Sequence, residues 1–352
     1  MLTPEKTKQL VDARMTQEFD ELIVRAGRIG EEYKELIRAI ARLGEEGGKR
    51  LRPHISMLLY EAYSKQPGEE VITAAVAQEF LHLAMLIHDD FMDRDLVRYG
   101  IRNVAGQYRD IYDPMIESPT RRSHEADSMA ILAGDLMQSR TYRLFNQVET
   151  TPARREQLEA LLADTVERVI GGQVLDTQAA FRAEGAINPL VVAEHKTASY
   201  TFEMPLLSGA ILGGAPESEL KILEQLGRTV GTGYQLMDDL LGVFGEENAT
   251  GKSADGDLRE GKQTILVQRF RKIATNEQLA EFDTIFGNHH ATTQELARAR
   301  ALLAESGVRK ALERDLSKIA RNASRLVETL SIDSKYKAAF IQLVSRGLDR
   351  KK

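Results

Sequence analysis

Apolar residues recur every three to four positions along almost the whole chain, which is the spacing of amphipathic helices. The first clear case covers residues 19–43, where Leu22, Ile23, Ala26, Ile29, Leu36, Ile37 and Ile40 fall at this spacing. Further helices are predicted over residues 54–63, 69–87, 129–145, 157–174, 190–212, 219–241, 265–286, 293–304 and 308–348. No alternation of apolar and polar residues is long enough to predict a strand. The pattern therefore predicts an all-α protein.

One long polar stretch, residues 106–127, interrupts this pattern after Gly100. It contains Pro114, Pro119, Arg121 and Arg122 together with several acids. Loops longer than about 12–15 residues are usually functional or disordered. We interpret this stretch as a surface loop that forms a partial lid.

The predicted helix that includes residues 81–87 runs directly into a cluster of aspartates. Asp89, Asp90 and Asp93 fall at positions i, i+1 and i+4, so Asp89 and Asp93 would share one face of a helix. Carboxylates this close repel one another unless water or a cation compensates for their charge. A solvated helix end is the simpler interpretation of one such cluster.

A second apolar helix ends in the same way. It carries Asp238 and Asp239, and Gly242 occupies the position of a third aspartate. Two such pairs, far apart in sequence, predict one site built from two facing helices. Mg²⁺ prefers one or two carboxylates together with waters and phosphate oxygens. The two pairs therefore predict a magnesium-bound di- or triphosphate.

Cationic residues provide further candidate contacts for such an anion. In GGKRLRP, residues 47–53, the glycines allow close backbone approach and Lys49 and Arg52 can bind a phosphate, although a helix end has the same composition. Lys196 lies within an apolar helix and needs a partner or a ligand, unless its ammonium group extends to the surface. The polar segment 248–264 carries Lys252 and Lys262 but lacks the spacing of a P-loop.

Composition narrows the class of protein. The chain has 352 residues, of which 42% are hydrophobic and 28% charged, and nothing in it suggests a linker, so we expect a single domain over residues 1–352. There is no cysteine and no apolar run of the roughly 18–20 residues of a membrane span. The first twenty residues are polar and unlike a signal peptide, which predicts a cytoplasmic protein without a membrane span. A net charge of −6 argues against a nucleic-acid binder.

Several short motifs occur together in a fixed order: GGKRLRP, HDDFMD, AILAGD, GGQ-LD, KTASYT, GYQLMDD and GKSADGDLREGKQT. In this order, over nearly the whole chain, they resemble the trans-isoprenyl diphosphate synthases, also called polyprenyl synthetases. The resemblance implies an isoprenoid synthase fold, a helical bundle around a central apolar cavity with both aspartate clusters at its mouth. It also implies Mg²⁺, a homodimer, and two substrates: isopentenyl diphosphate and an allylic diphosphate (dimethylallyl, geranyl or farnesyl).

The resemblance also implies roles for individual residues. The metal would be bound by Asp89, Asp90, Asp93, Asp238 and Asp239. Isopentenyl diphosphate would lie against Lys49, Arg52 and His82, and the allylic diphosphate against Arg98 and Lys196, with Lys252 and Lys262 as further substrate contacts. Lys196, Thr197 and Gln235 would face the allylic carbocation, and Gln235 would also contact the substrate.

The product is expected to extend along the helix before Asp89, where Leu81, Ala84 and Met85 would limit its length. Because Ala84 is small and leaves depth, we favour geranylgeranyl diphosphate, with farnesyl diphosphate or a longer product as alternatives. The chain departs from the family pattern at Tyr99, where a second arginine is usual, at Gly242, and in the length of the segment 106–127.

Three other functions remain open on the sequence. A class I terpene cyclase shares the first aspartate motif, but the basic GGKRLRP segment and the second aspartate motif argue against it. A non-catalytic subunit of a heteromeric synthase conflicts with the intact acidic clusters, although Tyr99 is compatible with it. The remaining alternative is a purely structural helical bundle.

Overall fold

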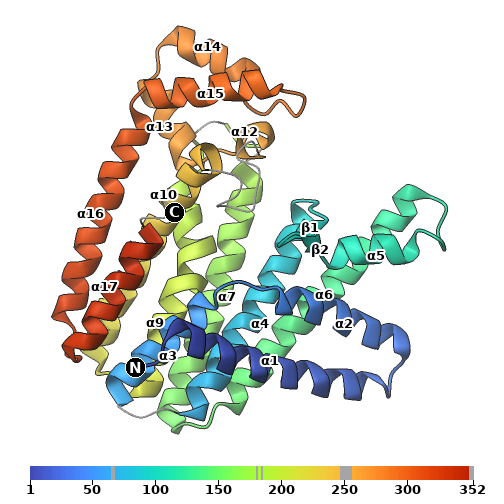
Figure 1. Cartoon of the computed structure of the whole chain (residues 1–352), viewed down its shortest axis with the longest axis vertical. Coiled ribbons are helices and arrows are strands. Elements are labelled where there is room, and N and C mark those ends of the chain that lie inside the picture. Colours follow the sequence, from blue (N-terminus) through green and yellow to red (C-terminus); the bar gives the residue numbers. More distant parts are fainter. Residues whose placement is uncertain (65–67, 180, 184, 246–255, 349–352) are drawn as a thin grey trace. The chain divides into compact units, whose positions relative to one another are not determined.

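Most of the described part of the chain is helical (Figure 1). The structure, a computed structural model, describes residues 1–64, 68–179, 181–183, 185–245 and 256–348. By its internal contacts the chain divides into two units. Unit 1 comprises Met1–Leu161 and Pro205–Ala215, and unit 2 comprises Leu162–Met204 and Pro216–Lys352.

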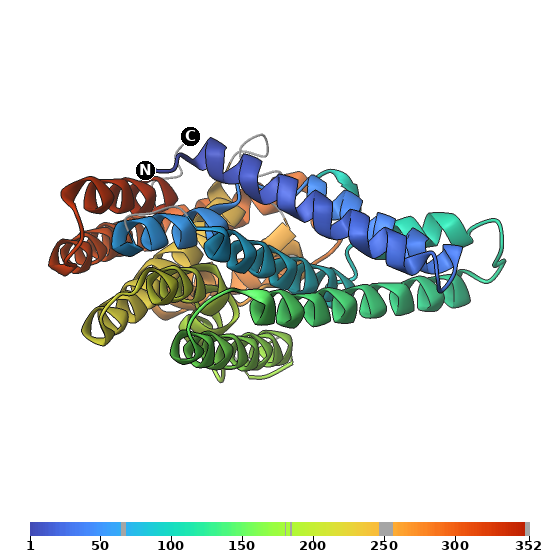
Figure 2. The ribbon, with the colours of Figure 1, turned by 90° about the horizontal axis from the view of Figure 1, so that it is seen from below.

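Unit 1 is built around a buried central helix. Its elements are α1 (Pro4–Ala26), α2 (Glu31–Glu45), α3 (Leu51–Ser64), α4 (Glu69–Met92), β1 (Val97–Arg98), β2 (Ile101–Arg102), α5 (Val104–Tyr112), α6 (Pro119–Gln147), the start of α7 (Pro152–Ala179) and most of α9 (Met204–Gly213). Helix α4 packs against α1, α3 and α6; Figure 2 shows α1 in dark blue and α6 in green. Most of α4 is buried because apolar residues cover nearly all of its sides. The first aspartate cluster therefore lies at the end of a core helix.

Helix α4 is also the one helix of the described residues with the length and apolarity of a membrane span. However, 72% of its most apolar window is buried inside the protein, as in the core helix of a folded domain.

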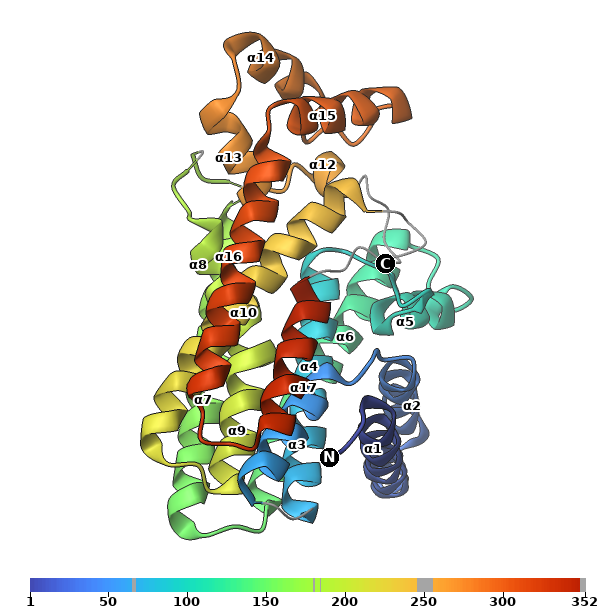
Figure 3. The ribbon, with the colours of Figure 1, turned by 60° about the vertical axis from the view of Figure 1, so that its left-hand side comes forward.

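Unit 2 is arranged around α10. Its elements are the rest of α7, α8 (Pro189–Val192), the π-helix η1 (Ala193–Glu203), α10 (Glu217–Phe244), α12 (Gly256–Glu260), α13 (Ile265–Ile273), α14 (Asn276–Ile285), α15 (Thr293–Glu305), α16 (Val308–Thr329) and α17 (Ser334–Leu348). Helix α10 packs against η1, α13, α16 and α17; α16 and α17 are the red helices of Figure 3. The α10–η1 contact brings the second aspartate pair close to the segment that carries Lys196.

The prediction of an all-α fold is confirmed, but the predicted loop over residues 106–127 is wrong. Most of this stretch belongs to α5 and α6. Gly106 lies inside α5. A glycine is needed there because a Cβ would come within 2.2 Å of the Leu96 carbonyl oxygen. Pro119 is the first residue of α6 and follows the N-cap Ser118, whose hydroxyl accepts from the Arg121 N–H. Gly106 is thus a packing residue within a helix, and Pro119 marks the start of the next helix.

Several other predicted ranges differ from the observed helices. Residues 265–286 form α13 and α14, and residues 308–348 form α16 and α17, rather than one helix each. The single helix predicted over 19–43 is two helices, because α1 ends at Ala26 and α2 begins at Glu31. The helix predicted over 157–174 is longer at both ends and spans Pro152–Ala179. The region 190–212 is not one α-helix but α8, the π-helix η1 and α9.

Candidate functional site

The first acidic cluster lies at the carboxyl end of α4. Asp89 is in the last turn, and Asp93 is the C-cap, whose backbone N–H donates to the Asp89 carbonyl oxygen at 2.8 Å. The two side chains are therefore one turn apart, with Asp89 half-buried and Asp93 exposed. This spacing presents two carboxylates from the same helix end.

Asp90 lies between them in sequence but has a different environment. It is 2% exposed. Its Oδ1 accepts from Arg98 Nε at 2.8 Å and its Oδ2 accepts from Asn103 Nδ2 at 3.1 Å. Burial opposes the charge of Arg98, but the hydrogen bonds and charge of Asp90 outweigh it and raise the pKa of Arg98, which stays cationic. Asp90 therefore holds the short hairpin that follows α4.

That hairpin turns through Tyr99 and Gly100. Both have positive φ, 54° and 79°, and they separate the paired residues Arg98 and Ile101. Two consecutive residues with positive φ are the requirement of a type I′ turn. Tyr99, the departure from the family pattern, is thus an exposed residue at the tip of a tight turn.

Several cationic groups of unit 1 lie around His82. Burial lowers the pKa of His82 well below its ordinary value, and the charges of Arg52, Arg50 and Arg98 lower it further. The histidine is therefore neutral at pH 7, and the arginines give this region a positive potential that favours an anion. Lys49 is exposed, and Arg52 in the same segment is half-buried.

Arg50, which the sequence did not single out, fixes the segment that carries Lys49 and Arg52. It is buried and has φ 51°. Its guanidinium donates to Asp12 Oδ1, Glu79 Oε2 and the Gly44 carbonyl oxygen, each at 2.7 Å. These partners belong to α1, α4 and α2, so one side chain connects the basic segment to three helices.

The second acidic pair is constructed like the first. Asp238 is exposed, whereas Asp239 is 4% exposed. Asp239 Oδ1 accepts from Gln235 Nε2 at 2.9 Å and its Oδ2 accepts from the Ile265 N–H at 3.0 Å. Thr197 donates from Oγ1 to Gln235 Oε1 at 3.2 Å. The structure thus brings together three of the predicted site residues of unit 2.

The remaining predicted residues lie as follows. Lys196 Nζ is 2.6 Å from Asp176 Oδ2, and Lys262 is exposed before α13. Lys252 lies outside the described residues. Leu81 and Ala84 are fully buried in α4, and Met85 is half-buried one turn before Asp89.

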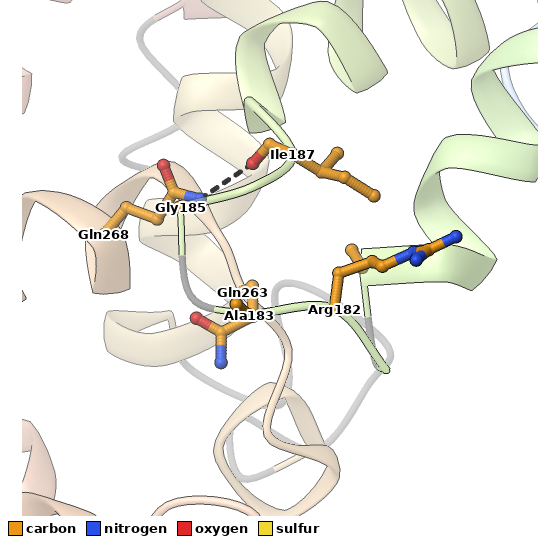
Figure 4. Close-up of a pocket in the computed structure, with 7 residues that line it drawn as sticks. Arg182, Ala183, Gly185, Ile187, Gln263 and Gln268 are labelled. Carbon is orange, nitrogen blue, oxygen red and sulfur yellow. Dashed lines mark hydrogen bonds between the residues drawn. The ribbon is translucent and has the colours of Figure 1, made fainter.

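A small hollow of unit 2 lies beside Gln263, next to Lys262. Its lining consists of Ala179, Arg182, Ala183, Gly185, Ile187, Gln263 and Gln268, and the Gln268 amide donates to the Ile187 carbonyl oxygen at 3.0 Å (Figure 4). Its volume of about 10 Å³ suits a single water. None of the predicted site residues lines this hollow.

The arrangement of possible ligands decides which kind of metal site these residues can form. Within the described ranges, no three His, Cys, Asp or Glu side chains are close enough together to hold a metal ion by themselves. Mg²⁺, unlike Ca²⁺, is usually bound by one or two carboxylates, waters and substrate phosphates. Asp89 with Asp93 fits that requirement when a phosphate ligand supplies the other oxygens.

Comparisons with known proteins point to one family. Residues 33–303 match the family model described as polyprenyl synthetase. A geranylgeranyl diphosphate synthase of Methanosarcina mazei is 33% identical over 261 residues, covering 74% of this chain and 73% of that protein. A (2E,6E)-farnesyl diphosphate synthase of Mycobacterium tuberculosis is 35% identical over 221 residues, covering 62% and 56%.

Among solved structures, a geranylgeranyl pyrophosphate synthase from Corynebacterium glutamicum, complexed with isoprenyl diphosphate and magnesium, is similar over 99% of this chain and 100% of its own. The TM-score is 0.92 at 26% sequence identity.

Proposed function

The chain belongs to the polyprenyl synthetase family, and from that premise we propose that it joins isopentenyl diphosphate to an allylic diphosphate to give an all-trans prenyl diphosphate. One observation supports this function most strongly. In both aspartate pairs the second carboxylate is buried and hydrogen-bonded, while the first is more exposed. Each pair thus combines one residue that fixes the local backbone with one that can reach a ligand.

This construction assigns the aspartates differently from the sequence prediction of five metal ligands. Asp89, Asp93 and Asp238 would hold Mg²⁺ together with the diphosphate. Asp90 and Asp239 use their oxygens on Arg98, Asn103, Gln235 and the backbone, so we assign them to positioning. Mg²⁺, when bound, neutralises the negative charge that develops on the leaving diphosphate.

The side chains of unit 2 would stabilise the allylic fragment. As the bond between its first carbon and the diphosphate oxygen breaks, positive charge develops on the allylic carbons. Thr197 and Gln235, held together at 3.2 Å, would present their dipoles to that charge. Lys196, held by Asp176, would bind the diphosphate.

Isopentenyl diphosphate would bind to unit 1 through Lys49, Arg52 and neutral His82. Its double bond attacks the allylic carbon, and a proton then leaves the new chain for the released diphosphate. The protein supplies no nucleophile, so its contribution is orientation, electrostatic stabilisation and exclusion of water.

We further propose geranylgeranyl diphosphate as the product and a cytoplasmic homodimer as the active form. The small side chain of Ala84 would leave room for a growing chain beside Leu81 and Met85. The relatives include both a geranylgeranyl and a farnesyl diphosphate synthase, which keeps farnesyl and longer products as alternatives. Ile131 and Leu132 on α6 are 41% and 51% exposed, and a second copy of the chain would cover them.

The experiment is an elongation assay with purified protein, Mg²⁺, isopentenyl diphosphate and each of the three allylic primers in turn. We expect geranylgeranyl diphosphate as the main product, and no product from Asp89→Ala. A product that stops at farnesyl diphosphate would refute the depth argument for Ala84. A cyclic hydrocarbon without elongation would favour a terpene cyclase, and activity only after addition of a second chain would favour a partner subunit. Failure to bind Mg²⁺-diphosphate would favour the alternative of a purely structural helical bundle.

A further inference from the structure

The segment that carries Lys196 and Thr197 is an uninterrupted π-helix. Element η1 spans 11 residues, Ala193–Glu203, whereas π-helices usually occur as single turns inside α-helices, often at functional sites. A stretch of this length persists only if its surroundings favour it over an ordinary α-helix. The neighbours of η1 in unit 2 are therefore informative.

Two glycines of α10 allow η1 to approach closely. A Cβ on Gly231 would lie 2.1 Å from Ala198 Cβ, and a Cβ on Gly227 would lie 2.6 Å from Glu203 Cγ. Gly227 and Gly231 are one α-helical turn apart, and Ala198 and Glu203 are one π-helical turn apart. One turn of each helix thus matches one turn of the other, and neither glycine position has room for a side chain.

The same face of α10 continues into the site. Gly227, Gly231, Gln235 and Asp239 follow one another at intervals of four residues, so they lie along one side of the helix. Gln235 accepts from Thr197 and donates to Asp239. The close approach at the glycines and the hydrogen bonds at the site are parts of one helix–helix contact.

A third glycine supports η1 from α7. A Cβ on Gly172 would lie 2.3 Å from the Lys196 backbone nitrogen and 2.8 Å from its Cα, distances that real Cβ atoms do not show. The adjacent Gly171 is exposed, and a Cβ there would have no atom within 4 Å. Two neighbouring glycines of one helix therefore differ in their contact with η1.

An ion pair fixes the end of η1. Arg168 of α7 donates from both terminal nitrogens to Glu203, at 2.7 and 2.8 Å, and Glu203 is 2% exposed. The hydrogen bond to Glu203 raises the pKa of Arg168 and outweighs the effect of burial, so Arg168 stays cationic. Bidentate Arg–carboxylate pairs are strong and orientationally specific.

We propose that Gly172, Gly231 and the Arg168–Glu203 pair are positioning residues that hold η1 in its wide form, so that Lys196 reaches Asp176 while Thr197 reaches Gln235. The inference rests on the proposed function for the identity of the substrate. The contact between η1 and its neighbours is independent of that function. In the proposed reaction, the binding of the allylic diphosphate depends on this contact.

The test compares Gly172→Ala with Gly171→Ala in the full-length protein. Alanine is the better helix former at both positions, so helix propensity affects both variants alike. We expect Gly171→Ala to keep wild-type kinetics. We expect Gly172→Ala to lose about 100-fold in kcat/KM for the allylic diphosphate, since displacements of about 1 Å have effects of that order, while KM for isopentenyl diphosphate is unchanged.

A purely structural role would give a different result, namely fewer active molecules, a lower kcat and both KM values unchanged. Arg168→Lys provides a second, milder variant in case Gly172→Ala does not fold, because it keeps the charge but loses the bidentate geometry. It should raise KM for the allylic diphosphate alone. Unchanged allylic kinetics in Arg168→Lys, and in Gly172→Ala where it folds, would overturn the inference.

A binding measurement separates this inference from the proposed function. Calorimetric titration with Mg²⁺ and inorganic pyrophosphate should show weaker binding by Gly172→Ala than by Gly171→Ala. If the wild type fails to elongate any primer, the proposed function fails, while this comparison still tests the role of η1. Equal binding by the two variants would contradict that role.

Discussion

The buried amide of Asn103 makes contacts of two kinds, which one substitution can separate. Its Oδ1 accepts from the Gly106 N–H at 2.9 Å and caps α5. Its Nδ2 donates to Asp90 Oδ2 at 3.1 Å and to the Asp95 carbonyl oxygen at 2.8 Å. Asn103→Asp keeps the shape and the cap, because Asn and Asp are equally good N-cap residues. If capping were its whole role, the variant would be as stable as the wild type.

The structure predicts a large loss instead. In Asn103→Asp, a second carboxylate lies 3.1 Å from Asp90, where two charges repel by about 5 kcal/mol at an effective dielectric constant of about 20. Protonating one of the two carboxylates needs less free energy, about 4 kcal/mol at pH 7, because the usual Asp pKa is about three units lower. Burial raises the pKa of Asp90 and reduces this cost. We expect a loss of about 3–4 kcal/mol at pH 7.

The sign of the pH dependence follows from the same proton. The folded variant binds one proton that the unfolded chain releases at pH 7, so its stability relative to the wild type rises as the pH falls. The deficit should shrink by about 1.4 kcal/mol for each pH unit between pH 7 and pH 5.

Urea unfolding followed by circular dichroism measures these values at pH 7 and pH 5.5. Asn103→Ser keeps a capping oxygen and adds no charge, so it should lose less than Asn103→Asp at pH 7. Ser118→Asp, at the N-cap of α6, is the matched capping control and should be nearly neutral. A variant Asn103→Asp as stable as the wild type, or a deficit that does not shrink on acidification, would refute the assigned contacts.

Three further predictions address unit 1. Glu79→Gln removes one of the two carboxylates that pair with buried Arg50 and leaves Asp12 as the other, so it should cost about 1.5–3 kcal/mol in urea unfolding; a wild-type midpoint would contradict the importance of this pair. The pKa of His82 is depressed in the folded protein, so the unfolded state takes up its proton first and stability should fall as the pH drops below about 6.5. Replacing His82 by Asn should weaken this dependence in parallel urea titrations, and an unaltered slope would show that other groups cause it. Tyr99→Arg adds a cation at the hairpin tip, so KM for isopentenyl diphosphate should fall while KM for the allylic substrate stays the same; steady-state kinetics in which neither KM moves would exclude a role for the tip.

Sequence patterns succeeded where local rules dominate. The helical periodicity and the spacing of Asp89 and Asp93 follow from contacts within one helix, and these could be predicted without a structure. The packing roles of Gly106 and Gly172 were not predicted, because a glycine in the sequence does not show whether it breaks a helix or allows a neighbour to approach. That distinction depends on atoms distant in sequence, such as the Lys196 backbone nitrogen.

The site was predicted in part for the same reason. Sequence patterns selected the paired aspartates, but not that one member of each pair would be buried. Arg50 lies inside the GGKRLRP segment and Asn103 follows the first aspartate motif, but the sequence does not show their roles, because their hydrogen bonds reach Asp90, Glu79 and the backbone through the fold. The π-helix was also missed, since its apolar residues are compatible with an ordinary helix.

In the proposed function, Asp89 and Asp238 would bind the same diphosphate through Mg²⁺. A double-mutant cycle tests it most directly, with calorimetric titration of Mg²⁺ and inorganic pyrophosphate into the wild type, Asp89→Asn, Asp238→Asn and the double variant. Residues that share a ligand have coupling energies of about 0.5–3 kcal/mol, so the account predicts that the two losses in binding free energy are not additive. Strictly additive losses, or a variant that binds as tightly as the wild type, would contradict it.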